Sequence, residues 1–463
     1  MSLLRIFFIF IIKFSLNYST LLFTNIHFRH GIRTAVYKIR SKSTDLFGKK
    51  WNNIGELTSP GIRQLYLTGV KHYYRYEKFL SNICQPNIIS VFSTNISRTI
   101  QSANAYLAGL CAFTKNEKLN LYQSEKSMPP GNISEKLKNF SESLNFSSVP
   151  NGISTIPVKV LTKNDHFFLL HDPYFISGCK AIDPIHKKIA RNNETKNIFN
   201  NFKNKFNEKL KKITGEELKR FRSILRLCDH LTSGLYNYDI TEYELLAKND
   251  IKIGNLVDEC HEVTKYYFSY IQGGVKEIVY MANSPLFKQL INWMDSRIKL
   301  DKENKTNLIK RGAPKYTVWS GHDSSVSTVM KFMENIFNTK FITPIFGTTI
   351  IFELHKNNKS AYYIKYFVND DLLLEVKYNE FKNKILEVLW SDVEINDFCQ
   401  FDIVKRKVFR DVINKYKMII IFVGVILLMS LLFNIIFYFK LRKMERKVKN
   451  KEEEGYELKE NII

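Results

Sequence analysis

A short segment near the start of the chain combines two arginines, a histidine and a glycine, in the order Arg29-His30-Gly31-Ile32-Arg33. Arginine presents a planar, permanently charged fork of donors that suits a phosphate dianion. An imidazole can attack phosphorus as a nucleophile, and glycine lets the backbone turn or approach an anion closely. The apolar run Thr20–Phe23 comes shortly before it, so we expect a buried strand to end at these side chains.

Two later segments place similar side chains directly after apolar runs. They are Ser93-Thr94-Asn95-Ile96-Ser97-Arg98 and His322-Asp323. The carboxyl ends of parallel strands meet at one side of an α/β sheet, and helix N-termini there add backbone donors. Taken singly, Arg98 is better explained as a surface residue at the start of a helix, and His322-Asp323 as a capping pair. Together, the three strand ends predict an anion site.

The elements around these segments alternate between strand and helix. Buried strands are expected at 20–30, 87–92 and 315–321, with helices after them, which predicts a parallel sheet covered by helices. The apolar runs 348–354 and 361–368 resemble a strand pair that completes the sheet.

The middle of the chain has a different composition. Residues 116–260 are polar and rich in Lys, Asn and Ser, yet they keep helical patterns such as the one at 216–230. We therefore expect an inserted, mainly helical cap between two halves of a catalytic α/β domain, at 20–115 and 261–404. For residues 116–165, a disordered lid or linker is an equal alternative.

The bulk composition indicates a globular protein. Its 463 residues are 44% hydrophobic and 14% aromatic, which is enough for a large core. The net charge of +24 would suit anionic partners, but Lys and Asn occur throughout the chain. Since no nucleic-acid-binding module is visible, we expect no nucleic-acid partner.

Two apolar segments predict a membrane protein. Residues 1–19 begin with a basic residue and a short apolar run, as a secretory signal peptide does. Residues 418–439 are uncharged and long enough for a transmembrane helix. The prediction is a single-pass type I protein with a juxtamembrane linker at 405–417 and a cytoplasmic tail at 440–463. Its catalytic domain would then be lumenal or extracellular, in a lysosome-like vesicle, an endomembrane or the plasma membrane.

Cysteines and glycosylation sequons fit such a compartment. All six cysteines precede the expected span, which suggests up to three disulfides, and no spacing resembles a zinc site. Sequons begin at Asn17, Asn95, Asn132, Asn139, Asn145, Asn193, Asn304 and Asn358. A glycan on Asn95 would obstruct the anion site, so we predict that this asparagine is unmodified.

Together these motifs resemble the histidine acid phosphatases, the branch of the histidine phosphatase superfamily that contains lysosomal and prostatic acid phosphatases and phytases. Residues 29–35 resemble the family's Arg-His-Gly-x-Arg-x-Pro motif, with Ala35 in place of the proline. Residues 93–109 resemble its Ser-Thr-Asp-x-Asp-Arg-Thr block, with two acidic residues replaced. Residues 320–325 resemble its Ser-Ala-His-Asp-Thr-Thr motif, and 55–64 its Gly-Gln-Leu-Thr stretch.

The resemblance covers roughly residues 20–400 and implies a fold. That fold is α/β, with a phosphoglycerate-mutase-like three-layer core, a central mostly parallel sheet flanked by helices, and an inserted cap. It also suggests a disulfide between Cys179 and Cys399. Cys84–Cys111 and Cys228–Cys260 then remain as candidate local pairs.

The resemblance also implies a role for each site residue. His30 would be the nucleophile and Asp323 the proton donor, while the phosphate would be bound by Arg29, Arg33, Arg98 and His322. No cofactor or metal is expected, because guanidiniums supply the positive charge. These charges would keep His30 neutral in acid, which predicts an acidic pH optimum.

Other functions remain open on the sequence alone. A phytase-like or phosphotransfer member of the family would carry the same residues, and a catalytically silent, membrane-anchored surface or binding protein would keep the fold. The expected substrate is a small phosphomonoester or a phosphoprotein. A homodimer is compatible with the sequence.

Overall fold

The structure, a computed structural model, describes most of the chain. The described residues are 19–37, 53–79, 84–86, 88–113, 118–147, 156–161, 179, 181–215, 217–238, 251–308, 312–399, 421–422, 424 and 427–444. They divide into two compact units, Met1–Asn396 and Asp397–Ile463. Residues 1–18 of the expected signal peptide, the linker 405–417 and residues 445–463 of the expected tail lie outside the described residues.

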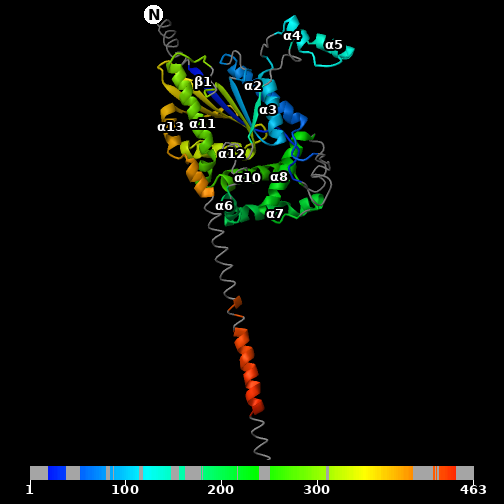
Figure 1. Ribbon diagram of the computed structural model, residues 1–463, viewed down its shortest axis with the longest axis vertical. Coiled ribbons are helices and arrows are strands. Elements are labelled where there is room, and N and C mark those ends of the chain that lie inside the picture. The colour runs from blue at the N-terminus through cyan, green and yellow to red at the C-terminus, as the bar shows by residue number, and fades with distance from the viewer. Residues whose placement is uncertain are drawn as a thin grey trace, which may run out of the picture. The chain divides into compact units, whose positions relative to one another are not determined.

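A seven-stranded sheet in the order β3-β2-β4-β1-β5-β6-β7 forms the centre of the first unit (Figure 1). Its strands are β1 (Thr20–Arg29), β2 (Ile89–Thr94), β3 (Val158–Leu161), β4 (Tyr316–Gly321), β5 (Thr349–Lys356), β6 (Tyr362–Val368) and β7 (Asp371–Lys377). The pairs among β1 to β4 are parallel, whereas β5, β6 and β7 are added by antiparallel pairing. Strand β6 therefore points the same way as β1, so five of the seven strands share one direction. The α/β class with a mostly parallel sheet is confirmed.

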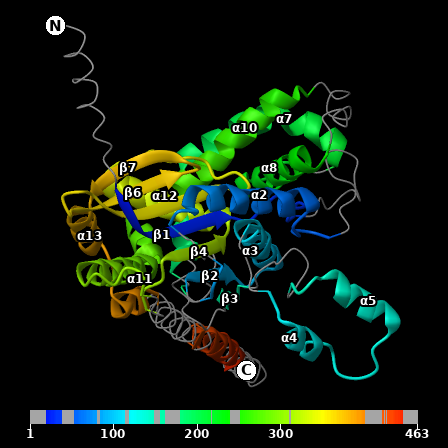
Figure 2. The same cartoon turned by 90° about the horizontal axis from the view of Figure 1, so that it is seen from above.

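Helices cover both faces of this sheet (Figure 2). One face carries α2 (Ser59–Tyr76) and α3 (Ser97–Leu110), and the other carries α11 (Lys276–Lys302), α12 (Asp323–Phe337) and α13 (Tyr378–Leu386). Successive strand side chains point to opposite faces. Strand β1 accordingly sends Ile26 and Phe28 into the core beneath α2 and α3, and Phe23 into the core beneath the other helices.

Most of the described residues between α3 and α11 are helical. Besides β3, the elements that the structure describes there are α4 (Leu121–Lys126), α5 (Glu135–Ser143), α6 (Ile182–Ile189), α7 (Asn193–Thr214), α8 (Phe221–Asn237), α10 (Ile253–Tyr266) and the π-helical segment η3 (Tyr267–Gln272). Helices α7, α8 and α10 enclose a buried cluster of their own that includes Phe202, Ile224 and Leu256. We call α6, α7, α8, α10 and η3 the cap helices.

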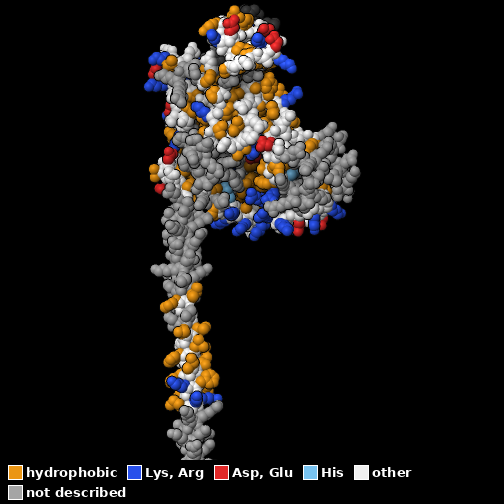
Figure 3. Space-filling model, turned by 45° about the vertical axis from the view of Figure 1, so that its right-hand side comes forward, with side chains coloured by type: hydrophobic (Ala, Val, Ile, Leu, Met, Phe, Trp, Pro, Cys, Tyr) orange, Lys and Arg blue, Asp and Glu red, His pale blue; other side chains and the backbone are white. Residues whose placement is uncertain are grey.

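Two features of this region differ from expectation. Strand β3 lies within the segment expected to be a helical insertion, but it pairs in parallel with β2 as an edge strand of the sheet. Positive charge is also less evenly spread than the composition indicates, because α7 carries six lysines and two glutamates. Figure 3 shows Lys and Arg side chains gathered along the lower edge of this part of the molecule.

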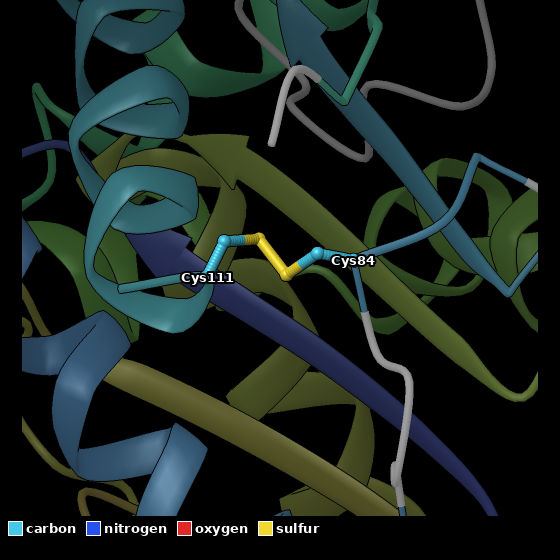
Figure 4. Close-up of a disulfide and its surroundings, with 2 residues drawn as sticks. All are labelled: Cys84 and Cys111. Atoms are coloured by element: carbon cyan, nitrogen blue, oxygen red, sulfur yellow. A yellow bond between two sulfur atoms is a disulfide. The ribbon is translucent and has the colours of Figure 1, made fainter. Parts of the chain in front are cut away.

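Disulfides stabilise both the core and the cap helices. Cys84, in the segment before β2, is bonded to Cys111 at the end of α3 (Figure 4). Cys228 of α8 is bonded to Cys260 of α10. These are the two local pairs expected from the sequence. Cys179 and Cys399 are disulfide-bonded as well, and their pairing with each other stays a prediction.

The second unit contains part of the segment expected to cross a membrane. Residues 427–444 are helical, as are residues 421, 422 and 424. Among the helices that the structure describes, none combines the length and the apolar character needed to span a bilayer. Residues 418–420, 423, 425 and 426 of the expected span 418–439 lie outside the described residues.

Helices α2 and α3 pack against each other through two glycines. A Cβ atom on Gly69 would lie 2.0 Å from the carbonyl oxygen of Tyr106, and one on Gly109 would lie 1.9 Å from that of Tyr66. Both distances are far below van der Waals contact with backbone atoms that cannot move independently. The glycines therefore set how closely α3, which begins with Ser97 and Arg98, approaches α2.

We predict that Gly69→Ala lowers the free energy of unfolding by about 1–3 kcal/mol, because the added methyl group forces the two helices apart. Thermal unfolding followed by circular dichroism measures the loss. The control is Gly254→Ala in α10, where a Cβ meets nothing within 4 Å. That substitution should be neutral or stabilising by up to about 1 kcal/mol. Equal melting temperatures for the two variants would contradict the prediction.

Candidate active site

Three neighbouring strands bring the chemically distinctive side chains to one side of the sheet. Strand β4 lies between β2 and β1, and the three run in parallel, so their carboxyl ends are adjacent. Arg29 is the last residue of β1, Arg98 is the second residue of α3 after β2, and Asp323 begins α12 after β4. The order of β2, β4 and β1 in the sheet therefore determines that the side chains at their carboxyl ends meet.

An ion pair joins the first and last of these strand ends. Arg29 Nη2 lies 2.9 Å from Asp323 Oδ2, with 8% of the arginine side chain and 25% of the aspartate side chain exposed. Arg29 Nη1 donates to the carbonyl oxygen of Pro344 at 2.9 Å. The guanidinium carbon also lies 4.3 Å from the ring centroid of Phe346. These contacts hold the guanidinium plane in one orientation.

His30 is buried, and its hydrogen bond selects one tautomer. Its Nδ1 lies 2.9 Å from the carbonyl oxygen of Gly31, which can only accept. Nδ1 therefore carries the proton, and Nε2 keeps the lone pair that a nucleophile needs. The backbone amide of His30 donates to the carbonyl oxygen of Gly321 at 2.9 Å, which ties the end of β1 to the end of β4.

Gly31 is required by packing. A Cβ atom on Gly31 would lie 2.5 Å from the carbonyl oxygen of Gly61, and one on Gly61 would lie 2.0 Å from that of Ile32. The amide of Gly31 also donates to Ser102 Oγ at 3.1 Å. The chain that follows His30 thus packs directly on the first turn of α2, which leaves no room for side chains at these two positions.

His322 connects the β4 end to the β2 end. Arg98 Nη2 lies 3.4 Å from His322 Nδ1, and an arginine nitrogen can only donate, so Nδ1 accepts. His322 Nε2 then carries the proton and donates to Thr94 Oγ1 at 3.0 Å. The His322 ring packs edge-on against His30, with centroids 5.6 Å apart. Arg98, His322 and His30 therefore form one continuous cluster.

Arg33 is held by a residue that the sequence analysis missed. Its Nη2 lies 2.7 Å from Oδ1 of Asp229, in α8, and its Nη1 lies 3.4 Å from Ser233 Oγ. Asn237 Nδ2 donates to the carbonyl oxygen of Arg33 at 3.2 Å. Asp229, Ser233 and Asn237 recur every fourth residue, so they occupy one face of the helix. That polar spacing was the available signal in the sequence.

Phe346 was also missed, although it contacts three of the predicted residues. Besides Arg29, its ring lies 5.4 Å from the Arg33 guanidinium carbon and 5.9 Å from the His30 ring centroid. Phe346 is 2% exposed and precedes β5. It therefore gives the two arginines a shared apolar support, against which cation–π contact is favourable.

Burial and positive charge keep both imidazoles neutral. Burial lowers the pKa of His30 well below its usual value of 6.5, and the charges of Arg98 and Arg29 lower it further. Burial lowers the pKa of His322 to about 3, again with Arg98 as the main charged neighbour. Both rings are therefore neutral in mildly acidic solution, where His30 keeps its nucleophilic lone pair.

Opposing effects act on Asp323. Burial raises the pKa of its carboxyl, but the charges of Arg29 and Arg33, with the backbone N–H of Ser324 and the neighbouring His322, together lower it by more, so the pKa lies below its usual value. Burial, together with Arg33, lowers the pKa of Arg98 to about 10, which leaves this guanidinium charged. A bound dianion would offset these charges and favour protonation of Asp323.

The structure thus brings together the six predicted side chains. They can hold a tetrahedral oxyanion with three guanidiniums, present a neutral imidazole to it, and place a carboxyl group beside it. Among the residues that the structure describes, no group of three or more His, Cys, Asp or Glu side chains is arranged to hold a metal ion.

Comparison with known proteins identifies relatives of the chain. The family described as the histidine phosphatase superfamily (branch 2) matches residues 12–369. The prostatic acid phosphatase of Bos taurus is 24% identical over 355 residues, which cover 75% of this chain and 77% of that protein. The testicular acid phosphatase of Homo sapiens is 37% identical over 93 residues, or 19% of this chain and 22% of that protein.

A solved structure shows the same fold. The phytase from Citrobacter braakii superimposes with a TM-score of 0.54 at 15% sequence identity. The superposition covers 82% of this chain and 99% of that chain. At this identity the likeness concerns the fold alone.

We predict that Arg98→Gln raises the pKa of His30, because Arg98 is the charged group with the largest effect on that imidazole. The pH dependence of the imidazole C–H resonances in NMR spectra measures the shift. Arg63→Gln, which removes an exposed arginine of α2, should leave the resonances unchanged. A His30 pKa that is the same in both variants would refute the electrostatic argument.

Proposed function

This chain belongs to the histidine phosphatase superfamily, branch 2, and we propose that it is an acid phosphatase that hydrolyses phosphomonoesters through a phosphohistidine intermediate. The observation that carries the proposal is the continuous cluster of three arginines, two neutral histidines and one carboxylate at the ends of β1, β2 and β4. This set of groups can bind, attack and protonate a phosphate ester.

In the first step, His30 Nε2 attacks phosphorus in line with the leaving group. The N–P bond forms as the P–O bond to the leaving group breaks, and Asp323 transfers its proton to the departing oxygen. Arg29, Arg33 and Arg98 neutralise the charge on the phosphoryl oxygens. Their positions are already fixed by Asp323, Asp229 and the backbone, so little reorganisation is needed when charge develops.

In the second step, water attacks the phosphohistidine. The N–P bond breaks, the electron pair returns to His30 Nε2, and the ionised Asp323 accepts a proton from the water. Inorganic phosphate then leaves, and the site regains its starting protonation. His322 stays neutral throughout and helps position Arg98 through the contact at 3.4 Å.

We also propose that the protein is a single-pass type I membrane protein with this site on the lumenal or extracellular side. The uncharged segment 418–439 and the apolar start of the chain support this arrangement. Disulfides in the core and the cap helices fit an oxidising compartment.

The full chain in detergent should release phosphate from p-nitrophenyl phosphate and from an alkyl phosphate, and the rate with the alkyl phosphate should rise as the pH falls below neutrality. The rise follows from protonation of Asp323, which an alkoxide leaving group requires, while the depressed pKa of His30 delays loss of the nucleophile. His30→Ala should reduce kcat by about three orders of magnitude or more. An inactive wild type, or a His30→Ala variant with most of the activity, would refute the proposal. Preference for inositol hexakisphosphate would instead indicate the phytase-like alternative.

The role of Asp323 predicts a dependence on the leaving group. Asp323→Asn should lower kcat by about 100-fold or more for an alkyl phosphate, whose alkoxide needs a proton. For p-nitrophenyl phosphate, whose leaving group is a weak base, the loss should be markedly smaller. Steady-state kinetics on both substrates measure the ratio within one variant, which cancels general damage to the site. An equal loss for both substrates would show that Asp323 is not the proton donor.

A further inference from the structure

Helix α8 contributes a carboxylate that contacts the loop after β1, residues 30–36, at two points. Asp229 Oδ1 lies 2.7 Å from Arg33 Nη2, and Oδ2 accepts the backbone N–H of Val36 at 2.7 Å. The aspartate side chain is 13% exposed. Each carboxylate oxygen thus accepts from an N–H donor. An asparagine side chain in the same place would turn its own N–H group toward one of these two donors and lose that hydrogen bond.

Arg29 and Arg33 each form an ion pair with one carboxylate. Arg29 is paired with Asp323 at 2.9 Å, and Arg33 is paired with Asp229 at 2.7 Å. With Arg98 added, three guanidiniums and two carboxylates leave one net positive charge, because both histidines are neutral. Without the charge of Asp229, the same group would carry two positive charges.

We propose that Asp229 is a positioning residue that fixes the Arg33 guanidinium and at the same time lowers the affinity of the arginine cluster, Arg29, Arg33 and Arg98, for inorganic phosphate. The inference rests on the proposed function, since weak binding of phosphate matters for an enzyme that must release it after each turnover. The charge of Asp229 also reaches Arg29 and Arg98, whose pKa values it raises. Its influence therefore extends over the whole cluster.

A purely structural role predicts the opposite behaviour. If Asp229 only fastened α8 to the loop, its removal would loosen Arg33, and phosphate would bind more weakly. If it also balances charge, removing the carboxylate leaves a more positive cluster, and phosphate binds more tightly. The sign of the change in affinity therefore separates the two roles.

The test measures the dissociation constant of inorganic phosphate by isothermal titration calorimetry, with the full chain in detergent. Asp229→Asn should bind phosphate about tenfold more tightly than the wild type, since the removed charge lies close to the bound anion. Its kcat and KM should fall together as product release slows. Asp229→Glu, which keeps the charge, should stay within about twofold of the wild type.

The matched control is Asp258→Asn, which removes the same charge from an exposed position on α10 and should leave phosphate binding unchanged. Phosphate binding by Asp229→Asn that equals or falls below the wild type overturns the proposal. If Asp229→Asn does not fold, Asp229→Ser takes its place, and failure of both to fold shows a structural role only. A wild type that binds phosphate without hydrolysing any ester would contradict the proposed function alone.

Discussion

Mutual repulsion among three buried or half-buried guanidiniums is the constraint on which this site depends. Arg33 contributes to the lowered pKa of Arg98, so these charges act on one another. The pairs Arg29–Asp323 and Arg33–Asp229 offset the repulsion without cancelling it. Burial lowers the pKa of His30 and His322, and the remaining positive charge lowers it further. The balance of charge that makes the site attract an anion therefore also favours neutral imidazoles.

The sheet makes this balance possible by bringing side chains together that are far apart in the sequence. Parallel pairing of β2, β4 and β1 aligns their carboxyl ends, and the next residue in each segment is polar. Close packing at Gly31 and Gly61 fixes the loop after β1, and Gly69 and Gly109 fix α3. The backbone thus limits where His30 and Arg98 can lie before any side chain interacts.

The parts of the fold that could be predicted from the sequence have strong local patterns. Apolar runs marked β1, β2 and β4, and the polar segments that follow these strands marked the six site residues. Strand β3 was missed because it has only four residues, none of them fully buried, inside a polar segment. Strand β7 was missed as well, although Asn369 and Asp370, both with positive φ, turn the chain from β6 into it. Short elements of this kind are defined by their partners more than by their own residues.

Asp229 and Phe346 were missed for a different reason, since their importance depends on contacts between distant segments. Asp229 lies 196 residues after Arg33 in the chain, and no local pattern connects the two. The placement of this aspartate depends on α8, which is anchored by the cluster shared with α7 and α10 and by the disulfide of the adjacent Cys228. Tyr236 of the same helix packs against Phe346, with ring centroids 5.5 Å apart. The cap helices therefore do more than cover the site, because α8 supplies the carboxylate partner of Arg33 and, through Tyr236, contacts the Phe346 ring that lies against the Arg33 guanidinium.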